Sequence, residues 1–579
     1  MSFERILSRI AAGESVAQSE LLPYLVLERR ERRSEVNRLL AEAYWKSGRE
    51  DYREHARVSI DRAWLLGGFP DQVLPLYVEI HAAFGDVVEI KAAYKRAGVI
   101  AAERGNVSLA IHYFNLWQYA YYDFSKLDRF EYDYEIINSI ERLARPHQFF
   151  SRAQPRSSAN GKLRLAYLVK GINELGSVMV KTMLLYARYH DRARVELMFF
   201  VPNAERDVMA SEVGRENVAL FEQAGCKITL APNMNTPHES LLALAREIHK
   251  SNADVLITAA ALAHFEHFYI TALRPAPFIV GWVVGPPPQF APPTLDWGIA
   301  WSTHPLIDCP VSCSLMNMEL ELPQRDRIAV HTRQELDIPE HAVIAATAGR
   351  HVKFQEPGFW RAVVDLLEEH PELYYLAMGV EEKQVPFVTP MLSPETRRRT
   401  RFLGWRGDDY MRNLCLADFY IDTHPSGGGT VVEDAAALGI PLIMFEQDFL
   451  RVYDQVHWSP AEDHFETRET VVPRGDYTAM KRLAARMIGD SEFRQRIAAH
   501  YCEHIHETRG DPARAVQQFE EIITRVLKEE AQGGVGRDAH EAEIRELSGH
   551  RNVPLLVGRA ARWLKRAMRY GERVLDRVA

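Results

Sequence analysis

Three consecutive glycines separate a strand-like run from a helix-like run in "DTHPSGGGTVVEDAAALGIPLIMF", residues 422–445. Gly427, Gly428 and Gly429 carry no side chain that would keep a ligand from the backbone, and Thr430 follows them. Backbone N–H groups at the start of a helix bind phosphate or another anion well. The run has neither the Gly-Lys-Ser/Thr ending of a P-loop nor the spacing of a dinucleotide fingerprint. It therefore predicts an anion-binding turn of a different kind.

Two polar residues flank this turn. Asp434 lies about one turn into the helix-like run, where a carboxylate can accept hydrogen bonds from the hydroxyls of a ribose. His424 stands just before the glycines and is a further candidate for substrate contact. The alternative is a tight strand-to-helix turn in which Asp434 only favours the positive end of the helix dipole. Three glycines, where one or two would make the turn, favour a binding role.

A second strand-to-helix loop, "AGRHVKFQEPGFW" at 348–360, carries two cations. Arg350 and Lys353 follow the first strand-like run of the second half of the chain. Because parallel strands end at the same edge of a sheet, we expect these cations to face the glycine turn. There they can neutralise a diphosphate leaving group without a metal, so we predict no metal and no cofactor. The alternative is a pair of ordinary solvated side chains.

Two α/β domains, at 160–340 and 341–530, are expected to position these loops. Short apolar runs such as "LRLAYLV" (163–169) and "AVIAATA" (342–348) alternate with helix-like stretches. Strands that alternate with helices form parallel sheets covered on both faces. The predicted fold class is α/β, with two Rossmann-like, doubly wound domains facing a cleft at the carboxyl ends of their strands. A proline-rich region at 302–340 separates the two domains.

Residues 1–150 are expected to form an all-α N-terminal domain. In "AYKRAGVIAAERGNVSLAIHYF", Gly98 and Ala110 let two helices approach closely and Gly105 makes the turn between them, as in a tetratricopeptide-like hairpin. The irregular spacing leaves a set of paired helices without repeat ancestry as the alternative. Either form predicts a unit for packing or for docking a partner.

The end of the chain differs in charge from the rest. After a polar linker (531–552), apolar residues at helical spacing run through 553–579, where seven basic residues face only Glu572 and Asp576. A basic amphipathic helix of this kind lies on an anionic membrane surface or docks on an acidic partner. A closing helix packed on the acidic body of the protein is an equal alternative.

The composition excludes several classes of protein. With 579 residues, a net charge of −9 and 47% hydrophobic residues, we expect a globular chain that does not bind nucleic acid. Five cysteines favour a reducing compartment over a disulfide framework. The charged N-terminus is unlike a signal peptide, and no run approaches the roughly 18 apolar residues of a membrane span. We expect a cytoplasmic protein, peripheral at the inner membrane if the basic tail binds lipid.

Two parts of the chain resemble a known family. "LRPAPFIVGWVVGPPPQFAPPTLDWGIA" (273–300), together with Lys353 and the glycine turn, is similar to O-GlcNAc transferases and bacterial adhesin N-glycosyltransferases. These are GT-B glycosyltransferases with helical repeats before the catalytic region, and the resemblance covers roughly 160–460. It implies that Lys353 contacts the diphosphate of a nucleotide-sugar donor. It also implies that the Gly429–Thr430 turn holds the phosphates and that Asp434 holds the ribose.

The chain departs from that family where the family has histidines. Gly429 takes the place of one in the phosphate turn, and neither "VKGINELGS" after the first strand nor "GPPPQFAPP" contains one. An inverting transfer needs a base for the proton of the acceptor, and Glu174 in the first of these loops is our candidate. Glu174 can equally cap the following helix. His264, His267 and His424 are rival candidates for the base.

The predicted function is transfer of a sugar from a nucleotide diphosphate donor, by resemblance a UDP-sugar, to an acceptor. The expected acceptor is a protein side chain, as in a flagellin or an adhesin, presented by the helical domain. A non-catalytic nucleotide-sugar-binding scaffold stays open as an alternative. A nucleotide-sugar epimerase or hydrolase of the same architecture also stays open, because fold alone does not define function.

Overall fold

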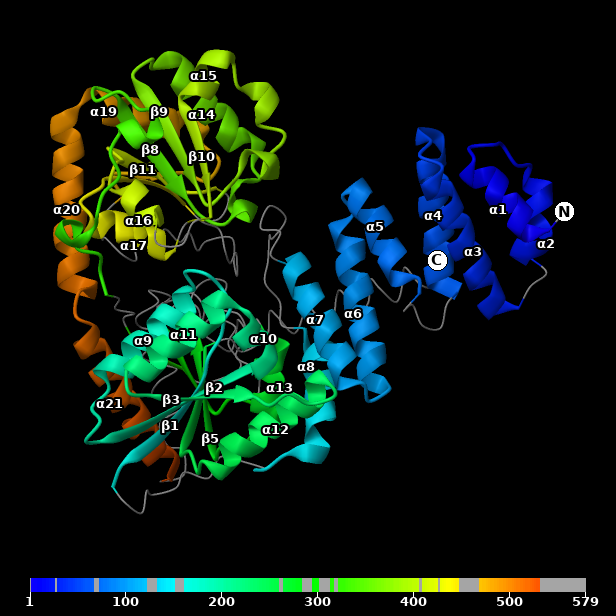
Figure 1. Ribbon diagram of the computed structural model, residues 1–579, viewed down its shortest axis with the longest axis horizontal. Helices are drawn as coiled ribbons and strands as arrows, with labels where there is room; N and C mark the ends of the chain where they lie inside the picture. The colour runs from blue at the N-terminus through cyan, green and yellow to red at the C-terminus, as the bar shows by residue number, and fades with distance from the viewer. Residues whose placement is uncertain are drawn as a thin grey trace, which may run out of the picture.

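The computed structural model shows a helical part followed by two α/β parts, each built on its own parallel sheet (Figure 1). Gly428, which was predicted to bind the anion, and the tail helix predicted at 553–579 lie outside the residues that the structure describes. The described residues are 2–26, 29–66, 72–121, 133–150, 161–259, 264–283, 294–300, 313–316, 321–405, 409–424, 427, 429–446 and 468–531.

The helical part consists of paired helices. The pair α6 and α7 is the hairpin expected from the small residues: a Cβ on Gly98 would clash with the ring of Phe114, so only glycine lets these helices meet. Gly105 turns the chain between them with φ +74°. The helices are α1 (Phe3–Ala11), α2 (Gln18–Val26), α3 (Arg30–Lys46), α4 (Glu50–Leu66), α5 (Leu74–Phe84), α6 (Val87–Glu103), α7 (Val107–Tyr121) and α8 (Tyr134–Ala144).

The first sheet is parallel throughout, in the order β3-β2-β1-β4-β5-β6-β7. The chain therefore changes direction across the sheet between β1 and β4, which makes that position its switch point. One strand, β7, lies inside the proline-rich region at 302–340 that was expected only to separate the domains. The strands are β1 (Leu163–Leu168), β2 (Val195–Ala204), β3 (Lys227–Ala231), β4 (Val255–Thr258), β5 (Phe278–Val283), β6 (Trp297–Ala300) and β7 (Cys313–Leu315).

Helices cover both faces of this sheet, because alternate residues of each strand point to opposite sides. Leu165 and Tyr167 of β1 belong to a buried cluster with α9 and α21, whereas Ala166 and Leu168 belong to a cluster with α12 and α13. The second cluster continues into the helical part, so the helical part and the first α/β domain share one core. The helices are α9 (Val178–Tyr189), α10 (Glu205–Ala210), α11 (Glu212–Gln223), α12 (Pro237–Lys250) and α13 (Phe265–Leu273).

The second sheet is also parallel, in the order β10-β9-β8-β11-β12-β13, with its switch point between β8 and β11. The predicted pair of doubly wound, Rossmann-like domains is thereby confirmed. The strands are β8 (Val343–Ala348), β9 (Leu373–Met378), β10 (Thr400–Gly404), β11 (Phe419–Ile421), β12 (Leu442–Phe445) and β13 (Val471–Val472). The helices are α14 (Pro357–Glu369), α15 (Pro394–Arg398), α16 (Asp409–Leu414), α17 (Thr430–Ala437), α19 (Tyr477–Gly489), α20 (Ser491–Arg509) and α21 (Pro512–Ala531).

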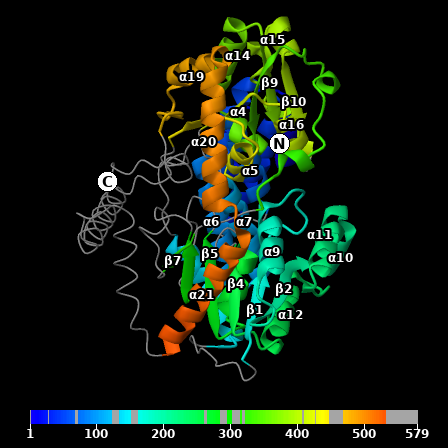
Figure 2. The same ribbon diagram turned by 90° about the vertical axis from the view of Figure 1, so that its left-hand side faces the viewer.

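The last two of these helices return the chain to the first α/β domain. Figure 2 shows α20 running down the side of the molecule from the second sheet and α21 continuing beside the first. Glu520 of α21 accepts a hydrogen bond from Nδ1 of the buried His190 at 2.8 Å, and His190 Nε2 lies 2.7 Å from Tyr167 Oη. The segment at 341–530 was predicted to form the second domain, but its final helix packs in the core of the first. Among the described residues, no helix combines the length and the apolar character needed to cross a bilayer.

Candidate functional site

The glycine turn and the cationic loop meet at the switch point of the second sheet. The glycine turn follows β11 and the cationic loop follows β8, and these two strands are hydrogen-bonded neighbours. Lys353 Nζ donates a hydrogen bond to the main-chain oxygen of Gly427. The structure therefore brings together the two loops that the sequence assigned to one site, at the place where open α/β sheets bind ligands.

The amine of Lys353 is largely removed from water. Burial lowers the pKa of Lys353 to about 8, the carboxylate of Asp422 raises it and the neighbouring charge of Arg350 lowers it again. Asp422, at the end of β11, is fully buried, whereas Arg350 is exposed just before the short helix η7 (His351–Phe354). Lys353 and Arg350 repel each other, and the single carboxylate of Asp422 balances only one of their two charges. A bound anion would relieve this repulsion, so the site favours one.

The glycine turn needs glycine for its backbone. Gly429 precedes α17 with φ 58° and ψ −127°, a conformation that residues with a Cβ avoid. No described atom lies within 4 Å of the place where its Cβ would stand, so the described residues leave this side of the turn open. Gly427 is buried, Gly429 is exposed, and the partly exposed Thr430 begins the helix. The positive end of α17 thus faces outward next to Lys353.

Asp434 lies in α17 and is bonded to a residue that the sequence did not single out. Its carboxylate accepts a hydrogen bond from the hydroxyl of Tyr410 in α16. Burial raises the pKa of Asp434 to about 7, while the bond from Tyr410 and the charge of Lys181 in α9 lower it. Both the charged and the neutral form of Asp434 are therefore populated near pH 7, and the charge of Lys181, in the opposite domain, favours the charged form.

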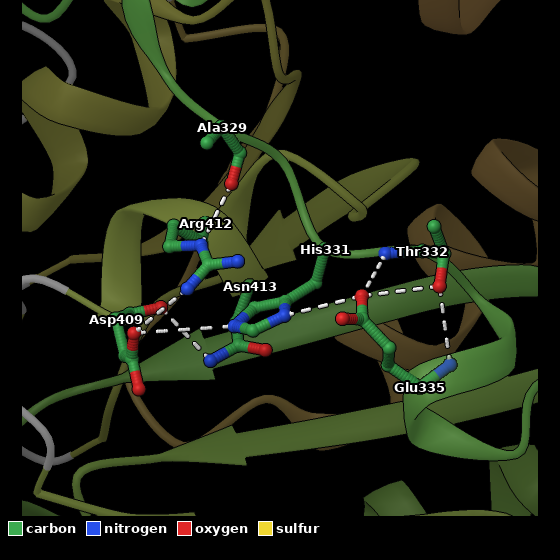
Figure 3. A network of polar contacts seen from close by, with 7 residues as sticks. All are labelled: Ala329, His331, Thr332, Glu335, Asp409, Arg412 and Asn413. Carbon is green, nitrogen blue, oxygen red and sulfur yellow. Dashed lines mark hydrogen bonds and ion pairs between the residues drawn. The ribbon is translucent and has the colours of Figure 1, made fainter.

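A polar network holds α16, and with it Tyr410, against the segment that connects the two α/β domains (Figure 3). Arg412 Nε donates to the main-chain oxygen of Ala329 at 2.7 Å. His331 lies between Glu335, at 3.3 Å, and Asp409, at 4.0 Å. The partner of Asp434 is thus fixed by contacts that reach outside its own short helix.

His424 is buried at the end of β11 rather than open to a substrate. Its Nδ1 lies 2.9 Å from the hydroxyl of Tyr477, and its ring packs on Phe445 at 4.8 Å between centroids. Burial lowers the pKa of His424 to about 4, and the charge of Arg474 adds to this effect. The structure therefore encloses His424 between Tyr477 and Phe445 as a neutral imidazole.

A second group of polar residues gathers at the switch point of the first sheet. Lys170 follows β1, and burial lowers its pKa to about 8 against the charge of Glu174, while Arg350 of the second domain lowers it further. His264 directly precedes α13, and His267 lies within it with Nδ1 at 3.1 Å from Thr258 Oγ1. Burial and the charge of Lys170 lower the pKa of both histidines, so both are neutral near pH 7.

The carboxyl edges of the two sheets face each other. Trp405, just past β10, donates a hydrogen bond from Nε1 to the main-chain oxygen of Leu175 at 3.2 Å. Leu175 belongs to the loop after β1 that also carries Glu174. The charge of Arg350 acts on Lys170 across the same boundary. Candidate donor groups of the second domain and candidate acceptor groups of the first therefore lie on opposite sides of one region.

Glu174 lies in the loop after β1 and does not cap the next helix. It is exposed, whereas the residue at the N-cap of α9 is the buried Ser177, which makes no side-chain cap. A Cβ on Gly171, which has φ +73°, would lie 2.9 Å from Glu174 Oε2. The bare backbone of Gly171 leaves room for this carboxylate beside Lys170, so the helix-cap alternative loses its support.

The segment that carries the family resemblance contains a structural anchor. Arg274 adopts a left-handed conformation with φ 50° at the end of α13. Its guanidinium pairs with Asp296 Oδ2 at 2.7 Å and donates to the main-chain oxygen of Thr294 at 2.9 Å. Asp296 also accepts the N–H of Ile279 in β5 at 2.8 Å. Arg274 and Asp296 therefore connect the end of α13 to β5 and to the residues that lead into β6.

Three residues of the candidate site were not predicted from the sequence. Lys170 could have been found, because a lysine directly after the buried run of β1 stands at a strand end just as Arg350 does. Tyr410 and Tyr477 give no such signal, since they contact Asp434 and His424 from 24 and 53 positions away. In the described part of the chain, no group of three or more His, Cys, Asp or Glu side chains is arranged to hold a metal ion.

Comparisons with known proteins agree with this architecture. No protein-family model and no curated protein sequence matches the chain. Among solved structures, a point mutant of the Thermobaculum terrenum O-GlcNAc transferase superposes with a TM-score of 0.53 at 14% identity, over 93% of this chain and 98% of that one. The chain has the GT-B fold.

Two further structures are similar only at lower scores. A glycosyltransferase from Rickettsia africae has a TM-score of 0.46 at 14% identity, over 63% of this chain and 99% of that one. A putative UDP-N-acetylglucosamine 2-epimerase from Listeria monocytogenes has a TM-score of 0.42 at 13% identity, over 65% and 98%. Of these three, the O-GlcNAc transferase is the structure whose likeness extends over the helical part as well as both GT-B domains.

Proposed function

We propose that this protein is a glycosyltransferase that moves a sugar from a nucleoside diphosphate, a UDP-sugar, to a protein side chain. The observation that carries the proposal is the hydrogen bond from Lys353 to the main-chain oxygen of Gly427. This bond holds the lysine cation beside the turn that leads into α17, at the switch point of the second GT-B domain. A diphosphate fits such a site, because both its charge and its oxygen acceptors are matched. Asp434 then accepts hydrogen bonds from the ribose.

The transfer step follows from this placement. The nucleophilic atom of the acceptor bonds to the anomeric carbon while the bond from that carbon to the diphosphate oxygen breaks, and the electron pair stays on the diphosphate. Lys353, Arg350 and the N-terminus of α17 stabilise the charge that develops there. Glu174 takes the proton of the acceptor from the opposite side, so the sugar is transferred with inversion. The two cations supply the charge stabilisation that a divalent metal provides in other phosphate-transfer sites.

The helical part is proposed to present the acceptor, since paired helices offer extended surfaces to a protein partner. It shares a core with the first GT-B domain, and this supports a role of that surface on the acceptor side. The tail at 553–579 is proposed to bring the enzyme to an anionic membrane, with a flagellin or an adhesin as acceptor.

Mass spectrometry of candidate acceptors co-expressed with the protein tests this function. A fixed mass increment on one peptide is expected, and it identifies both the sugar and the acceptor residue. Lys353→Ala should abolish the increment, whereas Lys383→Ala, an exposed lysine whose side chain is 80% accessible, should retain it. Purified protein is also expected to melt at a higher temperature with UDP, because a ligand that binds only the folded state stabilises it.

The same experiments separate the alternatives. A thermal shift with UDP but no turnover of any UDP-sugar would identify a binding scaffold. Turnover that yields a free sugar or an epimer without a modified peptide would identify a hydrolase or an epimerase. If Lys353→Ala modified the peptide at the wild-type level, the donor diphosphate would not bind at Lys353 and the glycine turn.

A further inference from the structure

The helical part supplies hydrogen-bonding groups to helix α13 of the first GT-B domain. α13 begins directly after His264, at the switch point of the first sheet, and lies beside α7 and α8 (Figure 1). The aromatic ring of Phe265, in its first turn, is buried against Phe114 and Trp117 of α7, with centroids 5.3 and 6.4 Å apart. Two parts that are distant in sequence thus meet at the start of this helix.

The first turn of α13 is capped by a residue of the helical part. His264 occupies the N-cap position but makes no side-chain cap. Asn115 of α7 takes over this role: its Oδ1 accepts the main-chain N–H of Phe265 at 3.1 Å, and its Nδ2 donates to Glu266 Oε1 at 2.7 Å. A free N–H at a helix start is costly, and asparagine is among the best residues for satisfying it.

The other end of α13 is held in the same way. Gln148, after α8, donates from Nε2 to the main-chain oxygen of Ala272 at 3.0 Å. The N–H of Phe149 donates to the main-chain oxygen of Leu273 at 2.9 Å. These two bonds satisfy carbonyl oxygens that a helix end leaves without a partner. The helical part therefore holds α13 at both ends.

This helix matters to the site because of what stands at its start. His264 and His267 lie close enough to Lys170 for its charge to lower the pKa of both rings. Their ring centroids are 6.1 Å apart, and His267 is hydrogen-bonded to Thr258 at the end of β4. A shift of the first turn of α13 would move these imidazoles relative to Lys170 and, through it, to Glu174.

We infer that Asn115 is a positioning residue of the acceptor side: from the helical part, it fixes the first turn of α13, and with it His264, against Lys170. The consequence for turnover rests on the proposed function, whereas the consequence for α13 does not. The helical part is then a structural component of the catalytic centre as well as a surface for the acceptor.

Ser108 offers a matched control on the same helix. It lies two helical turns before Asn115, on the same face of α7. Its Oγ accepts the main-chain N–H of His238, in the first turn of α12, at 3.1 Å. Ser108→Ala thus removes a contact of the same kind, from the same helix, to a helix start that carries none of the candidate groups.

Hydrogen–deuterium exchange tests the structural half of the inference. Asn115→Ala should speed exchange of the first-turn amides of α13 about fivefold, the effect of a lost helix cap. Ser108→Ala should leave these amides unchanged and affect α12 instead. In the double variant N115D/E266Q the donor and the acceptor change places, so the contact is kept and exchange should return to the wild-type rate. Unchanged exchange at α13 in Asn115→Ala overturns the inference.

Kinetics test the functional half, with the UDP-sugar and the acceptor peptide identified by the mass increment. Asn115→Ala should lower kcat about tenfold or more, because misplacement near the reacting groups is costly, while UDP affinity stays within about twofold. N115D/E266Q should recover kcat, and Ser108→Ala should retain it. Equal losses in both single variants, or a loss of UDP affinity that matches the loss of kcat, overturn the inference. If the wild-type protein transfers no sugar, the proposed function fails and the exchange result alone decides the role of Asn115.

Discussion

Replacement of Lys353 by methionine should stabilise the ligand-free protein at pH 7 while it abolishes sugar transfer. Burial lowers the pKa of Lys353 from 10.5 to about 8, so the folded state holds its charged amine at a cost. At 1.36 kcal/mol for each pKa unit, that cost is about 3 kcal/mol. Methionine also loses the hydrogen bond to Gly427, worth about 1 kcal/mol, so the expected net gain is about 2 kcal/mol.

The gain should depend on pH with a definite sign. Below about pH 8 the amine is protonated in both the folded and the unfolded chain, so the wild-type protein carries the full cost. As the pH rises from 8 to 10.5, the folded state releases its proton first and the wild-type protein becomes relatively more stable. Above that range only the lost hydrogen bond remains, and the variant should be the less stable protein by about 1 kcal/mol.

Urea unfolding at pH 7, 8.5 and 10 measures this crossing. Lys383→Met is the control in the same domain, because that lysine is exposed, and its stability should stay within about 0.5 kcal/mol of wild type at each pH. UDP should stabilise the wild-type protein and not the Lys353→Met variant. A variant less stable than wild type at pH 7, or a difference that does not change with pH, would refute the assignment of a desolvated lysine to this site.

Other perturbations have equally defined outcomes. Because burial raises the pKa of Asp434 from 3.8 to about 7, the unfolded chain loses its proton first as the pH rises through that range, and the wild-type protein loses stability there. Asp434→Asn should therefore be more stable than wild type above pH 7 and similar below pH 4 in urea unfolding, and it should bind UDP about tenfold more weakly in calorimetry. Gly98→Ala should destabilise the helical part by about 2 kcal/mol in thermal melts, since the new Cβ meets Phe114, and adding Phe114→Leu should recover part of the loss. Removal of 553–579 should weaken binding to anionic vesicles in a sedimentation assay, and equal binding by the shortened chain would exclude the membrane role.

Local signals in the sequence predicted most of the elements. Buried parallel strands are short apolar runs, so β1 and β8 could be placed within a residue or two. The conformation of Gly429 and the close helix contact at Gly98 follow from glycine itself, because a side chain at either place would be strained or would meet a neighbour. Such features depend on the residue and its immediate neighbours, which is why they can be predicted without a structure.

Long-range contacts could not be predicted in this way. The final helix of 341–530 crosses back to the core of the first domain, where Glu520 meets His190, 330 positions earlier in the chain. Asn115 caps Phe265 from 150 positions away. Neither residue carries a local sign of its partner, since a hydrogen bond between distant segments depends on how the elements pack and not on the neighbours in sequence.

The sequence by itself determined the two loops of the proposed donor site, because Arg350, Lys353 and the glycine turn are each set by residue type and by their place after an apolar strand. Only the tertiary structure decided that these loops touch, since the order of strands in the sheet makes β8 and β11 neighbours. It also decided that His424 is enclosed, that Glu174 stays exposed and that the helical part holds α13. Burial and strand order are properties of the packed chain, and they turn a set of candidate residues into a site.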